Sequence, residues 1–489
     1  MSQINISQLT FSYDGSAENV FDNVNLQLDT DWKLGLIGRN GRGKTTLLKL
    51  LTGELVGSGT IISHVDFEYF PYKVSSNKLF LIDVIREIAP GAEDWEIYRE
   101  MSLMKIDPDS DYQQFFTLSS GEQTKAMLVG LFLRQNSFLL IDEPTNHLDI
   151  EGRQQLGEYL SKKKGFVLVS HDRKFLDMCT DHILSINRAN ISLQKGNYSD
   201  WQIKKDMQDS LELAQIEKLT KDISRLSAAA ERTSAWSDKI EKSKYGGSVF
   251  DKGFVGHKSA KMMKRSKAIE ARQQSAIEEK SKLLKNVEQS APLKLSPLKF
   301  HSERLVRLEK VSIKYGDKPV CENVSFKISR GERIALTGKN GCGKSSILKL
   351  ICGDKINYSG QFIKNGQLKI SFVPQTTDHL SGTLKEYAYN LHIDLSLFLS
   401  ILRKLDFPRE LFEHSIENFS AGQKKKVLIA GSLCEQAHLY VWDEPLNFVD
   451  IISRSQIEQL ILDSEAAMIF VEHDELFREK IADQIVIIE

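Results

Sequence analysis

Two glycine-rich segments place lysine and hydroxyl side chains at a spacing suited to phosphate binding. GRNGRGKTTLLKLLTG occupies residues 38–53, and GKNGCGKSSILKLICG occupies residues 338–353. Both match the pattern GxxxxGK[ST], in which backbone N–H groups and a helix N-terminus favour phosphate oxygens. Lys44 or Lys344 would neutralise charge on the outer phosphates. These residue types therefore indicate a nucleoside triphosphate site in each segment.

Paired carboxylates follow later in the chain and suggest what happens to the triphosphate. Asp142 and Asp443 each end an apolar run, where a carboxylate can hold the shell of a magnesium ion, with Thr45 and Ser345 as hydroxyl ligands. The next residue is glutamate in both cases. Glu143 and Glu444 are then placed to polarise an attacking water. The alternative is that these carboxylates only cap the following helix.

An internal repeat explains why every motif occurs twice. LSSGEQ (118–123) returns as FSAGQK (419–424), LLIDEPTNHLD (139–149) as YVWDEPLNFVD (440–450), and VSHD (169–172) as VEHD (471–474). All these pairs, like the glycine-rich segments, are separated by about 300 residues, which indicates a duplicated domain of about 200 residues with an insert. We refer to the two halves as copy 1 and copy 2.

Each copy has the pattern of an α/β fold. Short β-branched runs such as 34–37, 138–141 and 166–170 alternate with helical stretches, which predicts a mainly parallel sheet covered by helices. The run 137–141 lacks polar alternation, so it should be buried on both faces. The predicted domains are copy 1 at 1–200, a linker at 201–292 and copy 2 at 293–489.

The linker has the pattern of a long helical hairpin. Apolar residues follow 3,4 spacing from Ile216 to Ala230, and no proline or glycine occurs between residue 201 and Gly246. YGGSVFDKGFVG (245–256) then interrupts the helix. Sevenfold spacing at Ile269, Ala276 and Leu283 predicts a second helix that returns antiparallel. Forty helical residues reach about 60 Å, so the hairpin is expected to project from the body.

Composition excludes several classes of protein. The chain has 489 residues, of which 27% are charged and 41% hydrophobic, and this is ordinary for a protein of two or three globular domains. Apolar stretches are too short to cross a bilayer, and the start MSQINISQLT has no signal-peptide plan. Five cysteines without CxxC spacing argue against disulfides and zinc. We therefore expect a cytoplasmic protein with reduced thiols.

The positive charge of the chain is concentrated in the linker. Residues 201–292 contain 19 Lys and Arg against 13 Asp and Glu, although the whole chain has a net charge of -1. The excess lies around the predicted tip near 243–258, which also carries aromatic residues. A charged solvated helix face is the alternative, but cations beside aromatics suit phosphates and unpaired bases of structured RNA. The candidate RNA-contacting residues are Lys242, Lys244, Tyr245, Phe250, Lys252, Phe254 and Lys258.

The order of glycine-rich loop, signature-like LSSGEQ or FSAGQK, acidic pair and histidine resembles the ATP-binding-cassette ATPases. The resemblance covers nearly the whole chain outside the linker. It implies a head-to-tail sandwich in which each ATP lies between the glycine-rich loop of one copy and the signature of the other. His171 and His473 would then contact the γ-phosphate region, with Glu143 and Glu444 as catalytic carboxylates. Tyr13 and Tyr315 match the aromatic that stacks on adenine, although strand packing is an alternative.

The resemblance assigns the remaining contacts residue by residue. ATP is expected to contact Tyr13, Gly38, Asn40, Gly41, Gly43, Lys44, Thr45, Thr46, Ser119, Gly121, Glu122, Tyr315, Gly338, Asn340, Gly341, Gly343, Lys344, Ser345, Ser346, Ser420, Gly422 and Gln423. Mg²⁺ is expected at Thr45, Asp142, Ser345, Gln375 and Asp443. The copies also differ, because Tyr72 stands where Gln375 supplies the Q-loop glutamine, and Leu446 and Phe448 replace Thr145 and His147. We therefore predict two competent but unequal ATPase sites.

The linker helps to distinguish between three kinds of cassette ATPase. A transporter subunit is disfavoured because no spanning helix is predicted, and a DNA-repair ATPase because neither copy has a coiled-coil insertion between loop and signature. Two cassettes joined by a basic helical linker resemble the ABC-F translation factors. The linker length, the opening ISQLTFSYDG and an end at Glu489 after the last predicted strand are most similar to the Lsa type of antibiotic-resistance ribosome-protection proteins.

That resemblance implies a specific role with ATP and Mg²⁺ as cofactors. The ATP-bound form, a monomer with intramolecular pairing of its copies, would enter the E site of the 70S ribosome. Its tip would approach the peptidyl-transferase centre, contact 23S rRNA and peptidyl-site tRNA, and release lincosamides, pleuromutilins or streptogramin A. No membrane or DNA partner is expected. The alternative is a housekeeping ABC-F factor without a resistance role.

Overall fold

The computed structural model describes residues 2–14, 19–76, 78–146, 148–187, 191–243, 261, 264, 267–269, 271–277, 295, 297–316, 318–339 and 341–488. Side chains are not described at residues 213, 230, 231, 233–243 and 318. Several predicted site residues therefore lie outside the described set, namely Asn340, Lys244, Tyr245, Phe250, Lys252, Phe254, Lys258 and the side chain of Lys242.

Copy 1 is built from two sheets with a helix packed between them. Its strands are β1 (Gln3–Phe11), β2 (Phe21–Asp29), β3 (Lys33–Gly38), β4 (Ser58–Ile62), β5 (Asp66–Phe70), β6 (Ser137–Asp142), β7 (Phe166–Val169), β8 (His182–Ile186) and β9 (Ile191–Lys195). A three-stranded antiparallel sheet has the order β2-β1-β4, and a six-stranded sheet has the order β5-β6-β7-β3-β8-β9. All pairs in the larger sheet are parallel except β8 with β9.

Burial on both faces explains the unbroken apolar character of the central strands. In β6, Phe138 and Leu140 join a core that includes residues of β1, β3 and the helix α1 (Lys44–Leu51). The alternate residues Leu139 and Ile141 are also buried, at 2% and 0% exposure. The predicted two-faced burial of 137–141 is confirmed. Because parallel strands end at the same sheet edge, the chain turns after β3 and β6 lie close together.

The remaining helices of copy 1 flank the larger sheet or form a helical subdomain. They are α2 (Leu81–Ile88), α3 (Asp94–Leu103), α4 (Ser120–Leu133), α5 (Ile150–Ser161) and α6 (Arg173–Cys179). Their starts are capped by side chains that also belong to motifs. Ser119 caps α4 through a capping box with Glu122, and Asp149 caps α5 by accepting from Gly152 N–H.

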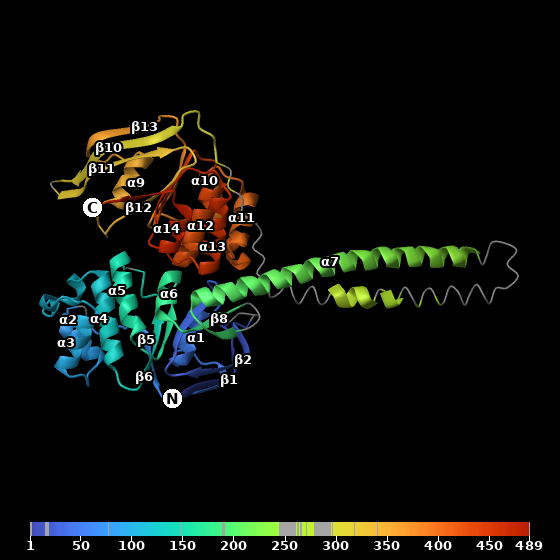
Figure 1. Cartoon of the computed structure of the whole chain (residues 1–489), viewed down its shortest axis with the longest axis horizontal. Helices are drawn as coiled ribbons and strands as arrows, with labels where there is room; N and C mark the ends of the chain where they lie inside the picture. The colour runs from blue at the N-terminus through green and yellow to red at the C-terminus, as the bar shows by residue number, and fades with distance from the viewer. Residues whose placement is uncertain are drawn as a thin grey trace. The chain divides into compact units, whose positions relative to one another are not determined.

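Copy 2 repeats this plan. Its strands are β10 (Arg304–Tyr315), β11 (Lys318–Ser329), β12 (Arg333–Thr337), β13 (Tyr358–Lys364), β14 (Ile370–Val373), β15 (Leu439–Asp443), β16 (Met468–Val471) and β17 (Gln484–Ile487). Its helices are α9 (Lys344–Cys352), α10 (Leu384–Asn390), α11 (Leu395–Lys404), α12 (Ala421–Cys434), α13 (Ile451–Leu462) and α14 (Glu475–Ile481). The sheets have the orders β11-β10-β13 and β14-β15-β16-β12-β17, the latter all parallel (Figure 1).

Between the copies, α7 (Tyr198–Ser243) is a single helix of 46 residues, about 70 Å long at the usual rise (green in Figure 1). Ile216 is buried, and Leu219, Ile223 and Leu226 are half-buried, whereas many intervening residues are exposed. The predicted long helix is confirmed. Residues 267–269 and 271–277 are also helical, but Leu283 lies outside the described residues, so the antiparallel return of the second helix stays a prediction.

The chain forms two compact units. One contains both copies (Met1–Ile186, Asn190–Ser199 and Ser290–Glu489), and the other contains Asn187–Ala189 and Asp200–Gln289. The second unit overlaps most of the predicted linker, while the bounds of the three predicted domains stay predictions. Among the described residues, no helix is both long and apolar enough to cross a bilayer. The predicted fold class, tandem α/β P-loop domains joined along the chain by a long helical segment, is confirmed.

Candidate functional site

Each glycine-rich loop is a strand-to-helix turn that holds its lysine over the loop carbonyls. Gly43 and Gly343 have φ of 91° and 92°, and a Cβ on Gly43 would lie 2.6 Å from Val20 Cγ1. Glycine is therefore required there for both backbone conformation and space. Lys44 Nζ donates to Gly38 O at 2.7 Å, and Lys344 Nζ donates to Gly338 O at 2.8 Å. Both side chains curl back along the loop that would surround a phosphate.

The acidic pair after β6 and β15 has an unusual backbone conformation in both copies. Glu143 and Glu444 have φ of 52° and 48°, in the left-handed region that residues other than glycine rarely adopt. Glu143 N–H donates to Val169 O at 2.9 Å, and Glu444 N–H donates to Val471 O at 3.0 Å, so the neighbouring strand fixes the turn. Strain maintained at the same position in both copies fits a role for the carboxylates beyond capping a helix.

Histidines from the next strand end reach these glutamates. His171 Nε2 lies 3.3 Å from Glu143 Oε1, and His473 Nε2 lies 3.3 Å from Glu444 Oε1. Burial, followed by the charge of Lys44, holds the pKa of His171 well below its ordinary value. The structure thus brings together lysine, aspartate, glutamate and histidine at the carboxyl ends of the parallel strands in each copy.

The surroundings of the two glutamates differ sharply. Glu444 receives hydrogen bonds from Gln375 Nε2 at 3.0 Å and from Asn447 Nδ2 at 2.7 Å. Burial alone would raise the pKa of Glu444, but the interactions with His473, Gln375 and Asn447 outweigh it and lower the pKa to about 2. Glu444 is therefore a carboxylate at neutral pH.

Glu143 has no comparable set of donors. Apart from His171, no described residue is placed to donate to its buried carboxylate oxygens, so the amide donors that Glu444 has are missing. Tyr72, which replaces the Q-loop glutamine, instead has its ring 5.9 Å from the guanidinium carbon of Arg134. Burial and the charge of Asp142 raise the pKa of Glu143 to about 8. The sites are thus unequal in the electrostatics of the glutamate, as well as in sequence.

The first site is completed by the signature of copy 2. Asn40 Nδ2 in the first loop donates to Phe448 O at 2.7 Å. A Cβ on Gly422 would lie 2.6 Å from Phe448 O and 3.1 Å from Asn40 Nδ2, so only glycine fits at this contact. Ser420 caps α12 by accepting from Gln423 N–H, which directs the start of the signature helix. The two halves of this site are therefore in direct contact.

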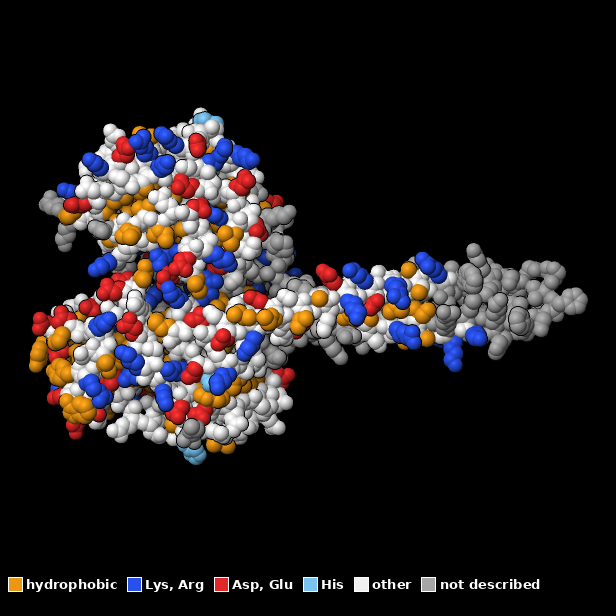
Figure 2. Space-filling model, viewed as in Figure 1, with side chains coloured by type: hydrophobic (Ala, Val, Ile, Leu, Met, Phe, Trp, Pro, Cys, Tyr) orange, Lys and Arg blue, Asp and Glu red, His pale blue; other side chains and the backbone are white. Residues whose placement is uncertain are grey.

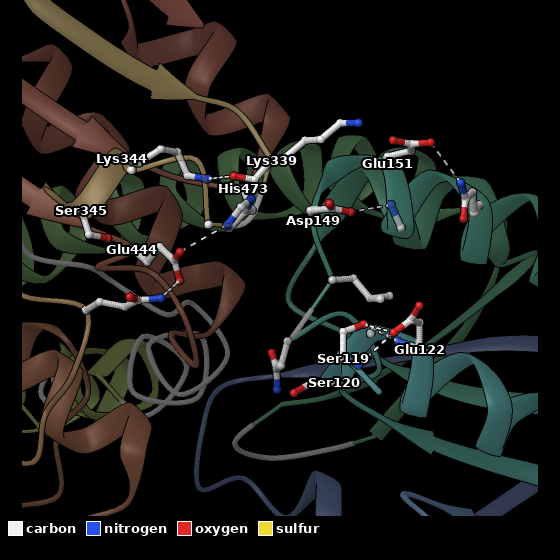
Figure 3. A pocket seen from close by; sticks show the side chains of 18 of the residues that line it. Ser119, Ser120, Glu122, Asp149, Glu151, Lys339, Lys344, Ser345, Glu444 and His473 are labelled. Atoms are coloured by element: carbon white, nitrogen blue, oxygen red, sulfur yellow. Dashed lines mark hydrogen bonds and ion pairs between the residues drawn. The ribbon is translucent and has the colours of Figure 1, made fainter. Parts of the chain in front are cut away.

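The second site is an open cavity of about 860 Å³ lined by both copies. Copy 2 contributes Gly341, Gly343, Lys344, Ser345, Ser346, Gln375, Glu444 and His473, and copy 1 contributes Ser119, Ser120, Gly121, Glu122 and Asp149. Figure 3 shows Lys344, Glu444 and His473 on one side of the cavity and Ser119 and Glu122 on the other. The structure thus brings the predicted loop and signature residues together at both sites, while their nucleotide contacts stay predictions.

The two tyrosines present exposed rings beside the loops. Tyr13 is 48% exposed and its hydroxyl lies 2.8 Å from Thr46 Oγ1, while Tyr315 is 53% exposed and donates to Ser346 Oγ at 3.3 Å. This much exposure disfavours the alternative role in strand packing. A ring tethered to the loop helix by its hydroxyl leaves one face for a base, as the adenine prediction requires.

The donor sets fit magnesium. Thr45 Oγ1 donates to Asp142 Oδ2 at 3.0 Å, and Asp443, only 2% exposed, has an Oδ1 without a hydrogen-bond partner among the described residues. A buried carboxylate oxygen beside a hydroxyl and phosphates is typical of a magnesium site, which needs few protein ligands. In keeping with this, the described residues contain no cluster of three or more His, Cys, Asp or Glu for a metal. Gln375 contacts Glu444 through its amide nitrogen.

Several contacts were not predicted from the sequence. Buried Arg173 of copy 1 forms ion pairs with Glu458 and Asp474 of copy 2, and Arg454 also binds Asp474. Burial of charges is tolerated here because each is paired. Asp474 ends the repeated motif VEHD, but its partners Arg173 and Arg454 lie in no motif, so no sequence signal identified these ion pairs. Asn447 could have been found, because Asn146 stands at the same position of copy 1.

At the first site, two arginines of the glycine-rich loop form ion pairs with an aspartate of the other copy. Arg39 Nη1 and Arg42 Nη2 lie 3.5 Å and 3.4 Å from Asp406 Oδ2, at the end of α11. Lys105 occupies the position in copy 1 that corresponds to Asp406, with φ of 54° against 55°. Lys105 Nζ instead lies 3.6 Å from Glu158 Oε2 of its own copy. This difference favours contact at the first site relative to the second.

Comparison with known proteins identifies the family. A family profile described as "ABC transporter" matches residues 21–146 and 321–447. The chain is 27% identical to the "Ribosome protection protein VmlR" of Bacillus subtilis over 96% of this chain and 84% of that protein. It is 26% identical to the "ATP-binding protein Uup" of Caulobacter vibrioides over 97% of this chain and 75% of that protein. It is also 26% identical to "ABC transporter F family member 2" of Arabidopsis thaliana, over 99% and 76%.

Solved structures share the fold. The archaeal ribosome recycling factor aABCE1, in a crystal structure with the ribosomal stalk protein aP1, matches with a TM-score of 0.65 and 18% identity over 99% of this chain and 87% of that chain. An "RNase-L Inhibitor" structure also gives a TM-score of 0.65 at 18% identity, over 99% and 88%. At this identity the likeness concerns the fold alone.

The paired, cross-completed P-loop sites define a tandem nucleoside-triphosphatase. The chain belongs to the ATP-binding-cassette (ABC transporter) family, with two cassettes, and it is an ATPase.

The ion pair at Asp406 gives a direct test of contact at the first site. Asp406→Asn keeps the left-handed backbone, which asparagine tolerates, and removes the charge. Solvent-accessible ion pairs contribute about 0.2–1 kcal/mol, and Asp406 is 32% exposed, so the ATP concentration for half-maximal hydrolysis should rise about two- to fivefold. The matched Lys105→Asn variant should leave it unchanged. Steady-state ATPase assays would contradict this interpretation if both variants behaved alike.

Proposed function

We propose that this chain is an ABC-F-type ATPase that binds the E site of the 70S ribosome and protects it from antibiotics of the peptidyl-transferase centre. The observation that carries the proposal is the combination of two cross-completed ATP sites with a long, basic helical segment between them. The similarity to VmlR, whose name describes ribosome protection, supports it over nearly the full chain.

The surface of the helical segment supports an RNA partner. Among its described residues, Lys204, Lys218, Lys221, Arg225, Arg232, Lys261, Lys264, Lys267 and Arg272 are exposed, whereas the exposed acidic residues are Asp200, Asp206 and Glu217. Figure 2 shows Lys and Arg side chains (blue) along this segment. Exposed cations on a long helix suit the phosphates of rRNA and tRNA. We expect Lys242, Lys244, Tyr245, Phe250, Lys252, Phe254 and Lys258 to extend this surface.

The chemistry in this proposal is the hydrolysis of ATP to ADP and phosphate. Lys44 and Lys344 hold the outer phosphates, the opposite signature closes over them, and Glu143 or Glu444 accepts a proton from the attacking water. Mg²⁺, held by Thr45 and Asp142 or by Ser345 and Asp443, supplies charge neutralisation on the phosphates. Loss of the γ-phosphate removes the ligand that both copies share, so the copies separate and the linker moves.

In a cell, the monomeric chain would work in the cytoplasm on ribosomes stalled by lincosamides, pleuromutilins or streptogramin A. ATP-dependent closure would insert the linker tip toward 23S rRNA and the peptidyl-site tRNA, and the shift of the tRNA would release the drug. A housekeeping ABC-F factor is the second candidate. The "ATP-binding protein Uup", whose name mentions no protective role, matches this chain at nearly the same identity and over nearly the same share of it as VmlR, so a role without protection is kept as an alternative.

Blocking hydrolysis tests the ribosome partner. The double variant Glu143→Gln and Glu444→Gln keeps the shape of both side chains but removes the proton acceptors, so hydrolysis should fall at least about 100-fold. With saturating ATP it should pellet with 70S ribosomes, whereas the wild type should mostly be released after turnover. Lys44→Ala with Lys344→Ala should not pellet, because ATP binding is lost. A hydrolysis-deficient variant that stays in the supernatant would reject the ribosome as partner.

Drug susceptibility separates the two candidates. Expression of the wild type should raise the minimum inhibitory concentrations of lincomycin, tiamulin and virginiamycin M. Phe250→Ala or Phe254→Ala should lower these concentrations again, since aromatic stacking on a base contributes about 1–3 kcal/mol. ATPase turnover of both variants should stay within about twofold of the wild type. Phe116→Ala is the control, because Phe116 is an aromatic of copy 1 that is 54% exposed. Wild-type protein that pellets with ribosomes but raises no inhibitory concentration would favour the housekeeping role.

A further inference from the structure

Asp142, the carboxylate proposed to hold magnesium at the first site, accepts a hydrogen bond from a second donor that no motif predicts. Tyr69 Oη donates to Asp142 Oδ2 at 3.0 Å, the same oxygen that Thr45 Oγ1 contacts at 3.0 Å. Two donors on one oxygen fix the plane of the carboxylate. They leave the other oxygen, Oδ1, as the atom able to face a cation.

The position of Tyr69 follows from strand register. Strands β5 and β6 are parallel, with Tyr69 opposite Leu140. Asp142 is two residues beyond Leu140, so its side chain leaves the sheet on the same face as that of Tyr69. Tyr69 is half-buried, which confines its ring and directs the hydroxyl along the sheet edge toward Asp142. The contact is thus built by the sheet and not by a loop.

Copy 2 lacks this donor and provides an internal comparison. Phe372 lies opposite Val441 in the pairing of β14 with β15, which is the register position of Tyr69. Phe372 has no hydroxyl, so β14 supplies no donor to Asp443 at this position. Three residues after Tyr69 and Phe372, it is copy 2 that has the donor. Gln375 donates to Glu444, whereas Tyr72 at the same position of copy 1 gives Glu143 no amide donor.

The segments YFPY (69–72) and FVPQ (372–375) therefore each supply one side-chain donor to the acidic pair, but from different positions. Copy 1 directs it to the aspartate expected to hold the metal, and copy 2 directs it to the glutamate expected to activate water. Partners that orient a metal-binding carboxylate commonly change metal affinity by about 10–100-fold. A donor on the glutamate acts on the water-activating group instead, without orienting the metal-binding carboxylate.

We propose that Tyr69 is a positioning residue that orients Asp142 for the metal, so that the first site holds the metal–nucleotide complex more tightly than the second. The first site then serves chiefly to keep the copies together and the second to turn ATP over. The contact between Asn40 and Phe448 O at the first site and the open cavity at the second agree with this division. The inference rests on the magnesium part of the proposed function and is independent of the ribosome.

The test measures metal affinity in addition to turnover. Lys344→Ala in the full-length chain disables the second loop, so binding of Mn²⁺ with the non-hydrolysable analogue AMPPNP reports the first site by electron paramagnetic resonance. In this background Tyr69→Phe removes only a hydroxyl and should weaken Mn²⁺ binding about tenfold. In the otherwise wild-type chain, Tyr69→Phe should raise the Mg²⁺ concentration needed for half-maximal turnover, because a misoriented ligand requires more metal to fill the site.

The converse variant keeps the proposal testable if Tyr69→Phe destabilises the fold. Phe372→Tyr in a Lys44→Ala background should strengthen Mn²⁺ binding at the second site about threefold or more, by supplying the missing donor to Asp443. A purely structural role of the Tyr69 hydroxyl would change thermal stability and leave metal affinity unaltered in both backgrounds. Mn²⁺ affinities within twofold of their parent proteins in both variants would overturn the proposal, whatever the outcome of the ribosome experiments.

Discussion

The structure depends on one constraint, which is that neither loop can surround a triphosphate alone. Lys44 and Lys344 lie on their own loop carbonyls, and the opposite faces of the two sites come from signatures about 380 and 220 residues away along the chain. A charged polyphosphate needs donors on several sides to leave water. Association of the copies is therefore the step that brings the residues of both sites together.

Buried ion pairs near the copy interface make the association specific. Arg173 reaches Glu458 and Asp474, and Arg454 shares the latter, so removal of one partner would leave a buried charge unpaired. At the first site, Arg39 and Arg42 add a further pair with Asp406. Lys105, which stands at the corresponding position of copy 1, pairs instead with Glu158 of its own copy, so this position links the copies through Asp406 alone. If the copies are held more tightly at the first site, they can separate at the second site and still remain in contact.

Much of this could be predicted from the sequence, and the limits have physical causes. The glycine-rich loops, the acidic pair and the histidines were found because local chemistry fixes both residue type and spacing. The two-faced burial of β6 and the length of α7 followed from apolar periodicity. The donor from Tyr69 to Asp142 was not predicted, because it depends on strand register, and tyrosine beside an apolar strand has no distinctive spacing. The pairs of Arg173 and Asp406 also required tertiary structure, since charged residues on a helix end are usually solvated.

In the proposed function, bound nucleotide controls the distance between the two copies. The most direct measurement is the distance between spin labels at Gln154 of copy 1 and Glu322 of copy 2, both in a cysteine-depleted chain that carries Glu143→Gln and Glu444→Gln. With Mg-ATP, pulsed electron resonance should give one short, narrow distance distribution, and without nucleotide a broader one at longer distance. A distribution that Mg-ATP leaves unchanged would contradict the account that shared ATP holds the two cassettes together.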